Sequence, residues 1–291
     1  MPSFHGADLH CHSTFSDGVE TPARLVGRAA EAGLSVLALS DHDALHGLPE
    51  FEAAAKGTGL VTVAATELST RCNGDDVHVL GLFVDPGEPE LEAKLLAFRR
   101  DRDKRGEEMV AKLAAIGIVL DLAGIRKTVG DGAFGRPHIA RAMLEKGYIS
   151  SFDEAFDRYL TKGKPGYVPK PKWTLEEAIR AIRVAGGLAV LAHPIWYQDP
   201  EKIVDLGVGA GLDGIEVFHV DQQGPRENEF ARLAERHDLL KSAGSDYHGP
   251  PEGRKQVGAC RLDEEKWKRM TAAAEKRRGE AGRPPLDLSP R

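Results

Sequence analysis

The sequence predicts an α/β protein built as an irregular barrel related to the (β/α) architecture, with an inserted, mainly helical module. Three observations predict this class. Short apolar runs alternate with amphipathic stretches of helical period, most runs are continuously apolar, and the rhythm stops between residues 84 and 188. Continuous apolar runs are typical of strands buried on both faces of a mostly parallel sheet. An open doubly wound sheet is the alternative, and a complete eight-unit barrel would need one more strand.

Seven apolar runs are candidate strands, at residues 7–9, 35–39, 60–65, 77–84, 188–192, 214–218 and 239–243. The first helix is expected over residues 22–32, because Thr21 can cap its start and Pro22 suits its first turn. Helices over 88–116, 137–146 and 152–160 make up the inserted module. Residues 277–291 carry adjacent prolines and many charges, so this end is expected to be loosely ordered.

The chain therefore divides into a barrel domain (1–97 and 173–280), a helical insertion (98–172) and a flexible tail (281–291). The insertion carries a formal charge of +6 and the rest of the chain −12. This segregation favours a basic substrate lid over an acidic, metal-bearing scaffold. A solvated helical surface with scattered charges is the alternative that charge alone leaves open.

Composition excludes several classes of protein. The 291 residues, 41% of them hydrophobic, suffice for a large core, and the net charge of −6 argues against a globally basic nucleic-acid-binding coat. Cys11, Cys72 and Cys260 are too far apart for a disulfide framework or a zinc ribbon, which favours a reducing compartment. The sequence shows neither a signal peptide nor an apolar run near the ~18 residues of a membrane span. We expect a cytoplasmic protein with no membrane partner.

The first chemical motif, DLHCHSTFSDG, follows the first predicted strand at residues 8–18. Side chains alternate along an extended chain, so His10 and His12 point the same way and can grip one metal ion. Asp17 can return to a metal from the following loop. Cys11 points away from this pair, and we expect it to pack in the core.

Similar side chains stand at the ends of other predicted strands. The motif SDHD (40–43) follows the second strand, Glu67 follows the third and His78 opens the fourth, while AHP (192–194) and GSDYH (244–248) follow later strands. Any one such histidine is more often a structural residue than a ligand, but strand ends at one barrel rim converge. The combination predicts a metal site made of His10, His12, Asp17, His42, Glu67, His78, His193, Asp246 and His248.

Nine ligands are too many for one ion. They suit two or three divalent ions that share Glu67, and the mixture of imidazole and carboxylate suits Mn, Fe or Zn better than Mg or Ca. Asp41 and Asp43 are expected to orient ligands or to cap the local backbone. Glu216 and His219 follow the sixth strand and either line the rim or play a structural role.

The ordered series HxH…SDG, SDHD, an isolated Glu, an isolated His, AHP and SDxH closely resembles the polymerase-and-histidinol-phosphatase (PHP) superfamily of metal-dependent phosphoesterases. The resemblance covers essentially the whole chain and implies a distorted (β/α)7 barrel with three metal ions, most of all Mn²⁺. By resemblance, the ions would be held by His10, His12, Glu67 and Asp246; by Glu67, His78 and His193; and by Asp17, His42 and His248. His10, His12, Glu67, His193 and Asp246 would be the residues central to catalysis.

The inserted motif Gly135-Arg136-Pro137-His138 resembles the bacterial branch that removes the 3′-phosphate from 3′,5′-nucleotide bisphosphates and is similar to a 5′-to-3′ exoribonuclease. Arg136 and His138 would then contact the substrate, since a helix start and a guanidinium both suit an anion. Lys170, in a basic loop, would help to hold a phosphate. The alternative is that these are ordinary surface and helix-start residues.

The residues agree with phosphoester hydrolysis. Three divalent ions against three carboxylates leave a positive pocket for a phosphate, and a hydroxide that bridges two ions would be the nucleophile. The resemblance implies 3′-phosphoadenosine 5′-phosphate, converted to AMP, as a substrate, with short single-stranded 5′-phosphorylated RNA as a related one. We expect no obligate protein partner. Histidinol phosphate is the alternative substrate, and a non-catalytic metal-binding regulatory domain is the alternative from another class.

Overall fold

The computed structural model describes residues 4–129, 134–169, 172–250 and 255–291. The chain forms two compact units, the first made of Met1–Ala93 with Lys172–Arg291 and the second of Lys94–Pro171. Within the described ranges, no helix combines the length and the apolar character that crossing a bilayer requires.

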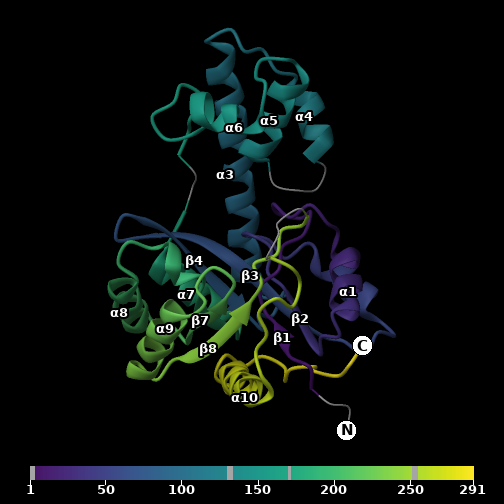
Figure 1. Cartoon of the computed structure of the whole chain (residues 1–291), viewed down its shortest axis with the longest axis vertical. Coiled ribbons are helices and arrows are strands. Elements are labelled where there is room, and N and C mark those ends of the chain that lie inside the picture. The colour runs from purple at the N-terminus through teal and green to yellow at the C-terminus, as the bar shows by residue number, and fades with distance from the viewer. Residues whose placement is uncertain (1–3, 130–133, 170–171, 251–254) are drawn as a thin grey trace. The chain divides into compact units, whose positions relative to one another are not determined.

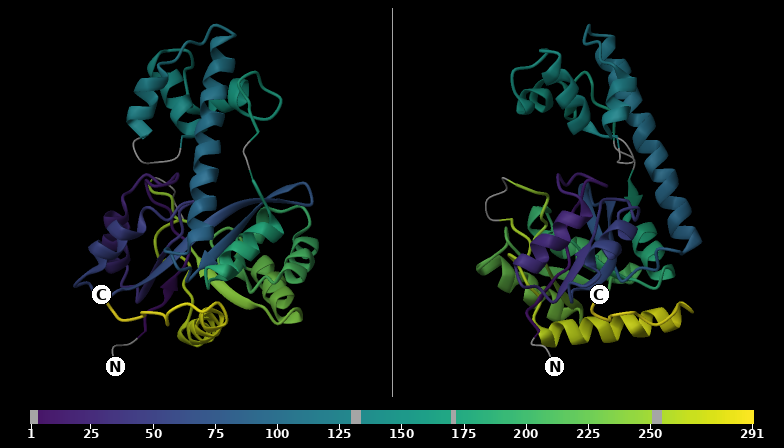
Figure 2. Two further views of the ribbon diagram at one scale, coloured as in Figure 1. Left: turned by 180° about the vertical axis from the view of Figure 1, so that it is seen from behind. Right: turned by 90° about the vertical axis from the view of Figure 1, so that its right-hand side faces the viewer.

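A nearly closed, barrel-like sheet forms the first unit (Figures 1 and 2). Its strands lie in the order β1 (Ala7–Asp8), β2 (Val36–Leu39), β3 (Val61–Cys72), β4 (Asp75–Leu82), β6 (Leu188–Leu191), β7 (Gly214–His219) and β8 (Leu240–Gly244), and the short β5 (Trp173–Thr174) pairs with β3. The Leu9 N–H donates to the Ala243 carbonyl at 3.0 Å, which brings the two ends of the sheet together. The predicted irregular barrel is confirmed, and the open sheet is not observed.

Strand β4 departs from the expected parallel arrangement. It runs antiparallel to both β3 and β6, whereas the other neighbouring strands are parallel. The cause is the Asn73-Gly74 turn, whose left-handed φ values of 49° and 90° close a two-residue hairpin, which joins only antiparallel strands. Strand β3 also runs to Cys72, well beyond its predicted end at Ala65.

Helices cover the outside of this sheet (Figure 1), namely α1 (Pro22–Glu31), α2 (Leu48–Ala55), α7 (Leu175–Val184), α8 (Pro200–Ala210), α9 (Pro225–Arg236) and α10 (Glu264–Glu280). Helix α1 begins as predicted, because the Thr21 hydroxyl accepts a hydrogen bond from the Arg24 N–H at 3.3 Å. Its buried residues Leu25, Val26 and Ala29 recur at helical spacing and pack in one hydrophobic cluster with Leu37 and Leu39 of β2.

The C-terminal segment, expected to be loosely ordered, is instead fixed to the first unit. Helix α10 runs to Glu280, and Leu286 and Leu288 pack against the core. The backbone N–H of Arg291 donates to the Leu60 carbonyl at 3.0 Å. Apolar side chains placed between the charges explain why this end of the chain is held.

The second unit is helical and has its own hydrophobic core. Helix α3 (Pro89–Ala114) continues into it, followed by α4 (Leu122–Val129), α5 (Arg136–Glu145), α6 (Phe152–Ala155) and a π-helical turn, η1 (Phe156–Leu160). Met109, Leu113, Phe134, Ile139 and Met143 are buried together in this core. Helices α3 and α5 and the α6–η1 segment fall where the 3.6-residue pattern predicted helices, whereas α4 was not predicted.

Candidate metal centre

The predicted ligands gather at the rim where the parallel strands end. Seven of them stand in the connections that follow β1, β2, β6 and β8: His10, His12, Asp17, His42, His193, Asp246 and His248. The predicted positions of Glu67 and His78 were wrong, because these residues lie inside β3 and β4 rather than at the strand ends. In the β3–β4 hairpin Glu67 pairs with Leu80 and Ser69 with His78, so Glu67 and His78 share one face.

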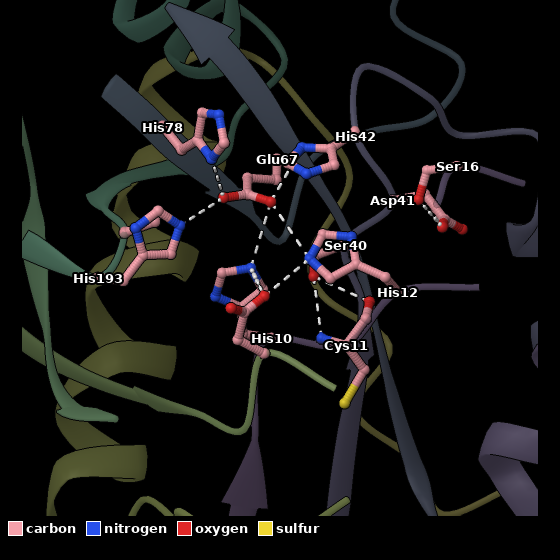
Figure 3. A network of polar contacts seen from close by, with 12 residues as sticks. His10, Cys11, His12, Ser16, Ser40, Asp41, His42, Glu67, His78 and His193 are labelled. Atoms are coloured by element: carbon pink, nitrogen blue, oxygen red, sulfur yellow. Dashed lines mark hydrogen bonds and ion pairs between the residues drawn. The ribbon is translucent and has the colours of Figure 1, made fainter. Parts of the chain in front are cut away.

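Glu67 lies at the centre of the cluster (Figure 3). Its Oε2 atom is 3.3 Å from His10 Nε2, 3.2 Å from His12 Nε2 and 3.0 Å from His42 Nδ1. Its Oε1 atom is 2.9 Å from His78 Nδ1 and 3.0 Å from His193 Nε2. Each carboxylate oxygen therefore serves a different group of imidazoles, as a carboxylate bridging two metal ions would.

Two aspartates complete the cluster. Asp246 Oδ1 lies 3.5 Å from His10 Nε2 and 3.4 Å from His12 Nε2. Asp17 lies 3.5 Å from His42 Nε2 and 3.3 Å from His248 Nε2. Three groups of ligand atoms within 4.8 Å of one another follow: His12, Asp17, His42 and His248; His10, His12 and Glu67; and His42, Glu67 and His78.

The ring nitrogens of this cluster fit metal ions. His10 Nε2, His12 Nε2, His42 Nδ1 and His78 Nδ1 are buried and make no hydrogen bond, and the same holds for Glu67 Oε2. Leaving one such atom unsatisfied costs about 1–3 kcal/mol, and here several are turned toward each other. A divalent cation, with its preference for imidazole and carboxylate, would satisfy them together.

The carboxylates of the cluster remain ionised despite their burial. Burial raises the pKa of Glu67, but the surrounding imidazoles of His42, His78 and His10 outweigh it and hold this pKa well below its usual range. The pKa values of Asp17 and Asp246 are lowered in the same way, mainly by His42 and His10 respectively against burial. Ionised oxygens are the form that binds a cation.

The histidines divide into two kinds. Burial lowers the pKa of His12, but the neighbouring carboxylates of Asp246 and Glu67 more than offset it, and the pKa rises to about 10. The pKa of His10 is also raised, against burial, by the charges of Glu216 and Glu67. Burial holds the pKa of His42 well below its usual value. With no metal bound, His10 and His12 therefore balance part of the acidic charge.

Buried aspartates hold the loops that carry the ligands. Asp41 accepts hydrogen bonds from the Ser13 N–H at 2.8 Å and from the Ser13 hydroxyl at 2.6 Å. It also accepts from the Ser16 hydroxyl at 2.6 Å (Figure 3). Asp43 accepts from the N–H and the hydroxyl of Ser69, both at 2.9 Å. These contacts match the predicted orienting and capping roles. Cys11 is buried in the core, as expected.

Sequence reasoning missed two supporting residues. Asp8 accepts from the backbone N–H groups of Ser245 at 3.0 Å and Gly258 at 2.7 Å, which ties the first strand to the loop of Asp246. The Tyr197 hydroxyl accepts from the His78 N–H and donates to the Ala192 carbonyl, both at 2.9 Å. The only sequence signal was proximity, since Asp8 and Tyr197 stand within four residues of predicted ligands.

Glu216 and His219 both face the cluster from β7. Glu216 Oε1 lies 2.9 Å from His10 Nδ1, and His219 Nε2 lies 3.6 Å from Asp246 Oδ2. Both side chains are fully buried. Both residues therefore lie at the rim and contact predicted ligands, and these buried contacts are also compatible with the structural role that the sequence left open.

The predicted substrate residues belong to the second unit or fall outside the described ranges. Arg136, the first residue of α5, lies over the Phe156 ring with its guanidinium carbon 5.6 Å from the ring centre. Burial, and then the charges of Arg136 and Arg102, lower the pKa of Arg105 to about 10, so positive charge gathers here. His138 Nδ1 accepts from the Gly135 N–H at 3.3 Å, which is a helix-capping contact. Lys170 lies outside the described residues.

A barrel-like α/β fold with histidine and carboxylate ligands gathered on one rim defines the class of metal-dependent hydrolases. The model of the family described as PHP domain matches residues 8–146. The chain belongs to this family of phosphoesterases, which confirms the resemblance seen in its motifs.

Two relatives are similar over most of their length. A Haemophilus influenzae protein named 5′-3′ exoribonuclease is 41% identical over 249 residues, which cover 84% of this chain and 90% of the relative. A Chromobacterium violaceum protein named 3′,5′-nucleoside bisphosphate phosphatase is 39% identical over 256 residues, which cover 86% and 90%. A solved structure from Bifidobacterium adolescentis, described as a metal-dependent phosphoesterase, superposes with a TM-score of 0.81 at 30% identity, covering 94% of this chain and 98% of that chain.

Proposed function

We propose that this protein hydrolyses the 3′-phosphate of 3′,5′-nucleotide bisphosphates, such as 3′-phosphoadenosine 5′-phosphate, and trims short 5′-phosphorylated RNA from its 5′ end. The observation that carries the proposal is that the two carboxylate oxygens of Glu67 face separate groups of histidines. The names of the two relatives supply the substrate classes.

The two activities are one reaction on two substrates. In both, the bond between a nucleotide's 3′-oxygen and phosphorus breaks, water supplies the new oxygen on phosphorus, and the 3′-oxygen takes a proton. The nucleotide carries a 5′-phosphate in both cases. The two substrates differ only in what else the reacting phosphate carries. In the bisphosphate it carries no further group, and in RNA it is esterified to the next nucleoside. One site can therefore serve both.

The residues of the rim have distinct tasks in this proposal. His10, His12, Glu67 and Asp246 would hold one ion, and Glu67, His78 and His193 would hold a second. Asp17, His42 and His248 would hold a third. Bound ions, with Mn²⁺ preferred over Fe²⁺ or Zn²⁺, would draw in the phosphate and make water nucleophilic near neutral pH.

The second unit supplies recognition of the phosphate that does not react. Arg136 offers a planar guanidinium that can bind a phosphate through two hydrogen bonds. The lowered pKa of buried Arg105 reflects burial and the positive charges beside it, which a bound anion would offset. Histidinol phosphate has a single phosphate, so it has no second phosphate for these arginines to bind. The three cysteines are free and buried, in keeping with a reducing compartment, and we place the activity in the cytoplasm.

A substrate panel tests this proposal. The full chain, reconstituted with Mn²⁺, is given 3′-phosphoadenosine 5′-phosphate, 3′-AMP, histidinol phosphate, and one trinucleotide RNA with either a 5′-phosphate or a 5′-hydroxyl. We expect the bisphosphate to give 5′-AMP and phosphate with the highest kcat/KM, and the 5′-phosphorylated RNA to be cut in preference to the hydroxyl form. Preference for histidinol phosphate, or an intact 3′-phosphate, would contradict the proposal.

A further inference from the structure

Strand β7 supplies none of the proposed metal ligands, yet it sends two buried polar side chains to the rim. Glu216 and His219 are three residues apart, so in a regular strand they would face opposite sides of the sheet. The pairing with β8 omits Val217, since Glu216 pairs with Ser242 and Phe218 with Ala243. This bulge shifts the alternation by one residue and turns both side chains toward the site.

Gln222 holds the bulge in place. A bulge takes backbone groups out of the regular ladder, and they need other partners when they are buried. The side-chain amide of Gln222, only 1% exposed, donates to the Glu216 carbonyl at 2.5 Å and to the Val217 carbonyl at 2.8 Å. The bulge is therefore a stabilised feature of the fold.

The Glu216 carboxylate is divided between two ligands. Its Oε1 accepts from His10 Nδ1 at 2.9 Å, and its Oε2 accepts from the backbone N–H of His193 at 2.8 Å. An ionised carboxylate only accepts, so His10 Nδ1 carries a proton toward Glu216, and Nε2 is the ring nitrogen that faces Glu67 and Asp246 and would bind a metal ion. The His193 contact holds a backbone with φ of 27°, a conformation that a non-glycine residue adopts only when it is held.

The neighbouring strand makes room for this arrangement. A Cβ atom on Gly244 would lie 2.2 Å from His10 Cβ and 2.5 Å from Glu216 Oε1, closer than atoms can approach. The absence of a side chain at Gly244 therefore lets His10 and Glu216 meet.

We infer that Glu216 is a positioning residue that sets His10 and His193 relative to each other, and that the bulge in β7 delivers it. His10 faces Oε2 of Glu67 and His193 faces Oε1, so Glu216 links the two ligand groups from behind. Partners of this kind behind metal ligands typically change metal affinity about 10–100-fold. The inference rests on the metal centre of the proposed function but not on its substrate.

Two variants separate position from charge. Glu216→Gln keeps the shape but replaces one accepting oxygen with a donor, so it cannot accept from both His10 and His193. Glu216→Asp keeps the charge but is one methylene too short to reach both. The matched control is Glu88→Gln, because Glu88 is also buried and accepts from a backbone N–H, that of Leu91, but does not belong to the cluster.

Mn²⁺ binding to the full-length proteins is measured by titration calorimetry and by electron paramagnetic resonance, without substrate. Both Glu216 variants should bind Mn²⁺ at least ~10-fold more weakly, with metal-free unfolding temperatures close to that of the unsubstituted protein, while Glu88→Gln keeps full affinity. Full affinity in Glu216→Asp would show that charge suffices and overturn the inference, as would full affinity in both variants. If Glu216→Gln does not fold, Glu216→Asp alone decides. A wrong substrate assignment would leave these results unchanged.

Discussion

Glu67 and His78 stand on the two strands of one hairpin, two residues apart in register, and Glu67 Oε1 lies 2.9 Å from His78 Nδ1. The other oxygen of the same carboxylate meets His42 at 3.0 Å from a different strand connection. Glu67 is thus shared between parts of the centre, whereas His78 contributes to only one. Loss of the Glu67 side chain should therefore disturb more of the centre than loss of the His78 side chain.

Replacing Glu67 should therefore do more damage than replacing His78. Glu67→Ala removes the shared negative charge and should lower metal content and reduce kcat/KM on the order of 10³-fold, whereas His78→Ala should lose less of both. Elemental analysis and phosphate release on the same samples check this. Glu108→Ala, at an exposed carboxylate of the second unit, controls for charge loss. Equal metal content and equal activity in the two variants would contradict the bridging role.

Metal binding should release protons. With no metal bound, burial lowers the pKa of His12 but the neighbouring carboxylates of Asp246 and Glu67 raise it to about 10, while Glu67 stays ionised. A metal ion must displace the His12 proton, so Mn²⁺ affinity should rise with pH until the pH reaches about 10. Titration calorimetry in buffers of different ionisation enthalpy counts the protons released. An affinity independent of pH, with no proton release, would show that this histidine is already neutral.

Arg136→Ala should separate recognition from chemistry. We expect KM for 3′-phosphoadenosine 5′-phosphate to rise about 10–100-fold, because a bidentate guanidinium contact to the second phosphate is lost. Hydrolysis of p-nitrophenyl phosphate and the metal content should hardly change, since that ester has one phosphate. Arg158→Ala, an exposed arginine of the same unit, is the control. A parallel loss on both substrates would instead assign Arg136 to the reacting phosphate, and no loss would make it a surface residue.

Tyr197→Phe tests the support behind two ligands. The variant leaves the His78 N–H without its acceptor, so the free energy of unfolding should fall by about 1–3 kcal/mol. Activity should fall about 10–100-fold through the displaced ligands, with the number of bound ions unchanged. Chemical denaturation and kinetics on the Mn²⁺-loaded protein measure the two effects. Unchanged stability together with unchanged activity would remove Tyr197 from this role.

Most of the metal ligands could be predicted from the sequence because they stand near the ends of predicted strands. His10, His42, His193 and Asp246 each stand within three residues of the end of an apolar run, and the ends of neighbouring parallel strands meet whatever the details of the barrel. Glu67 was found for the same reason but misplaced, since the mixed residues from Thr66 to Cys72 do not read as a strand. The antiparallel β4 was missed although Asn73-Gly74 is a strong hairpin signal.

Contacts made by the bulge and by the tail could not be predicted. The segment from Glu216 to Phe218 reads as an ordinary strand, and nothing in it shows that Val217 would lose its partner in β8. The residue that clamps the bulge, Gln222, lies beyond the strand. Leu286 and Leu288 are two apolar residues in a charged, proline-containing tail, and only the folded chain shows the core that receives them.

Counting the ions in the reconstituted protein tests the central claim, that the Glu67 cluster is a centre for several metals, most directly. The full chain is stripped with chelator, reloaded anaerobically with Mn²⁺ or Fe²⁺, desalted and analysed for metal per chain. Because the ligand set exceeds what one ion of four to six ligands can use, we expect two to three ions per chain, with phosphate release from the bisphosphate rising as they bind. One ion or fewer at full reconstitution would contradict a shared, bridging Glu67.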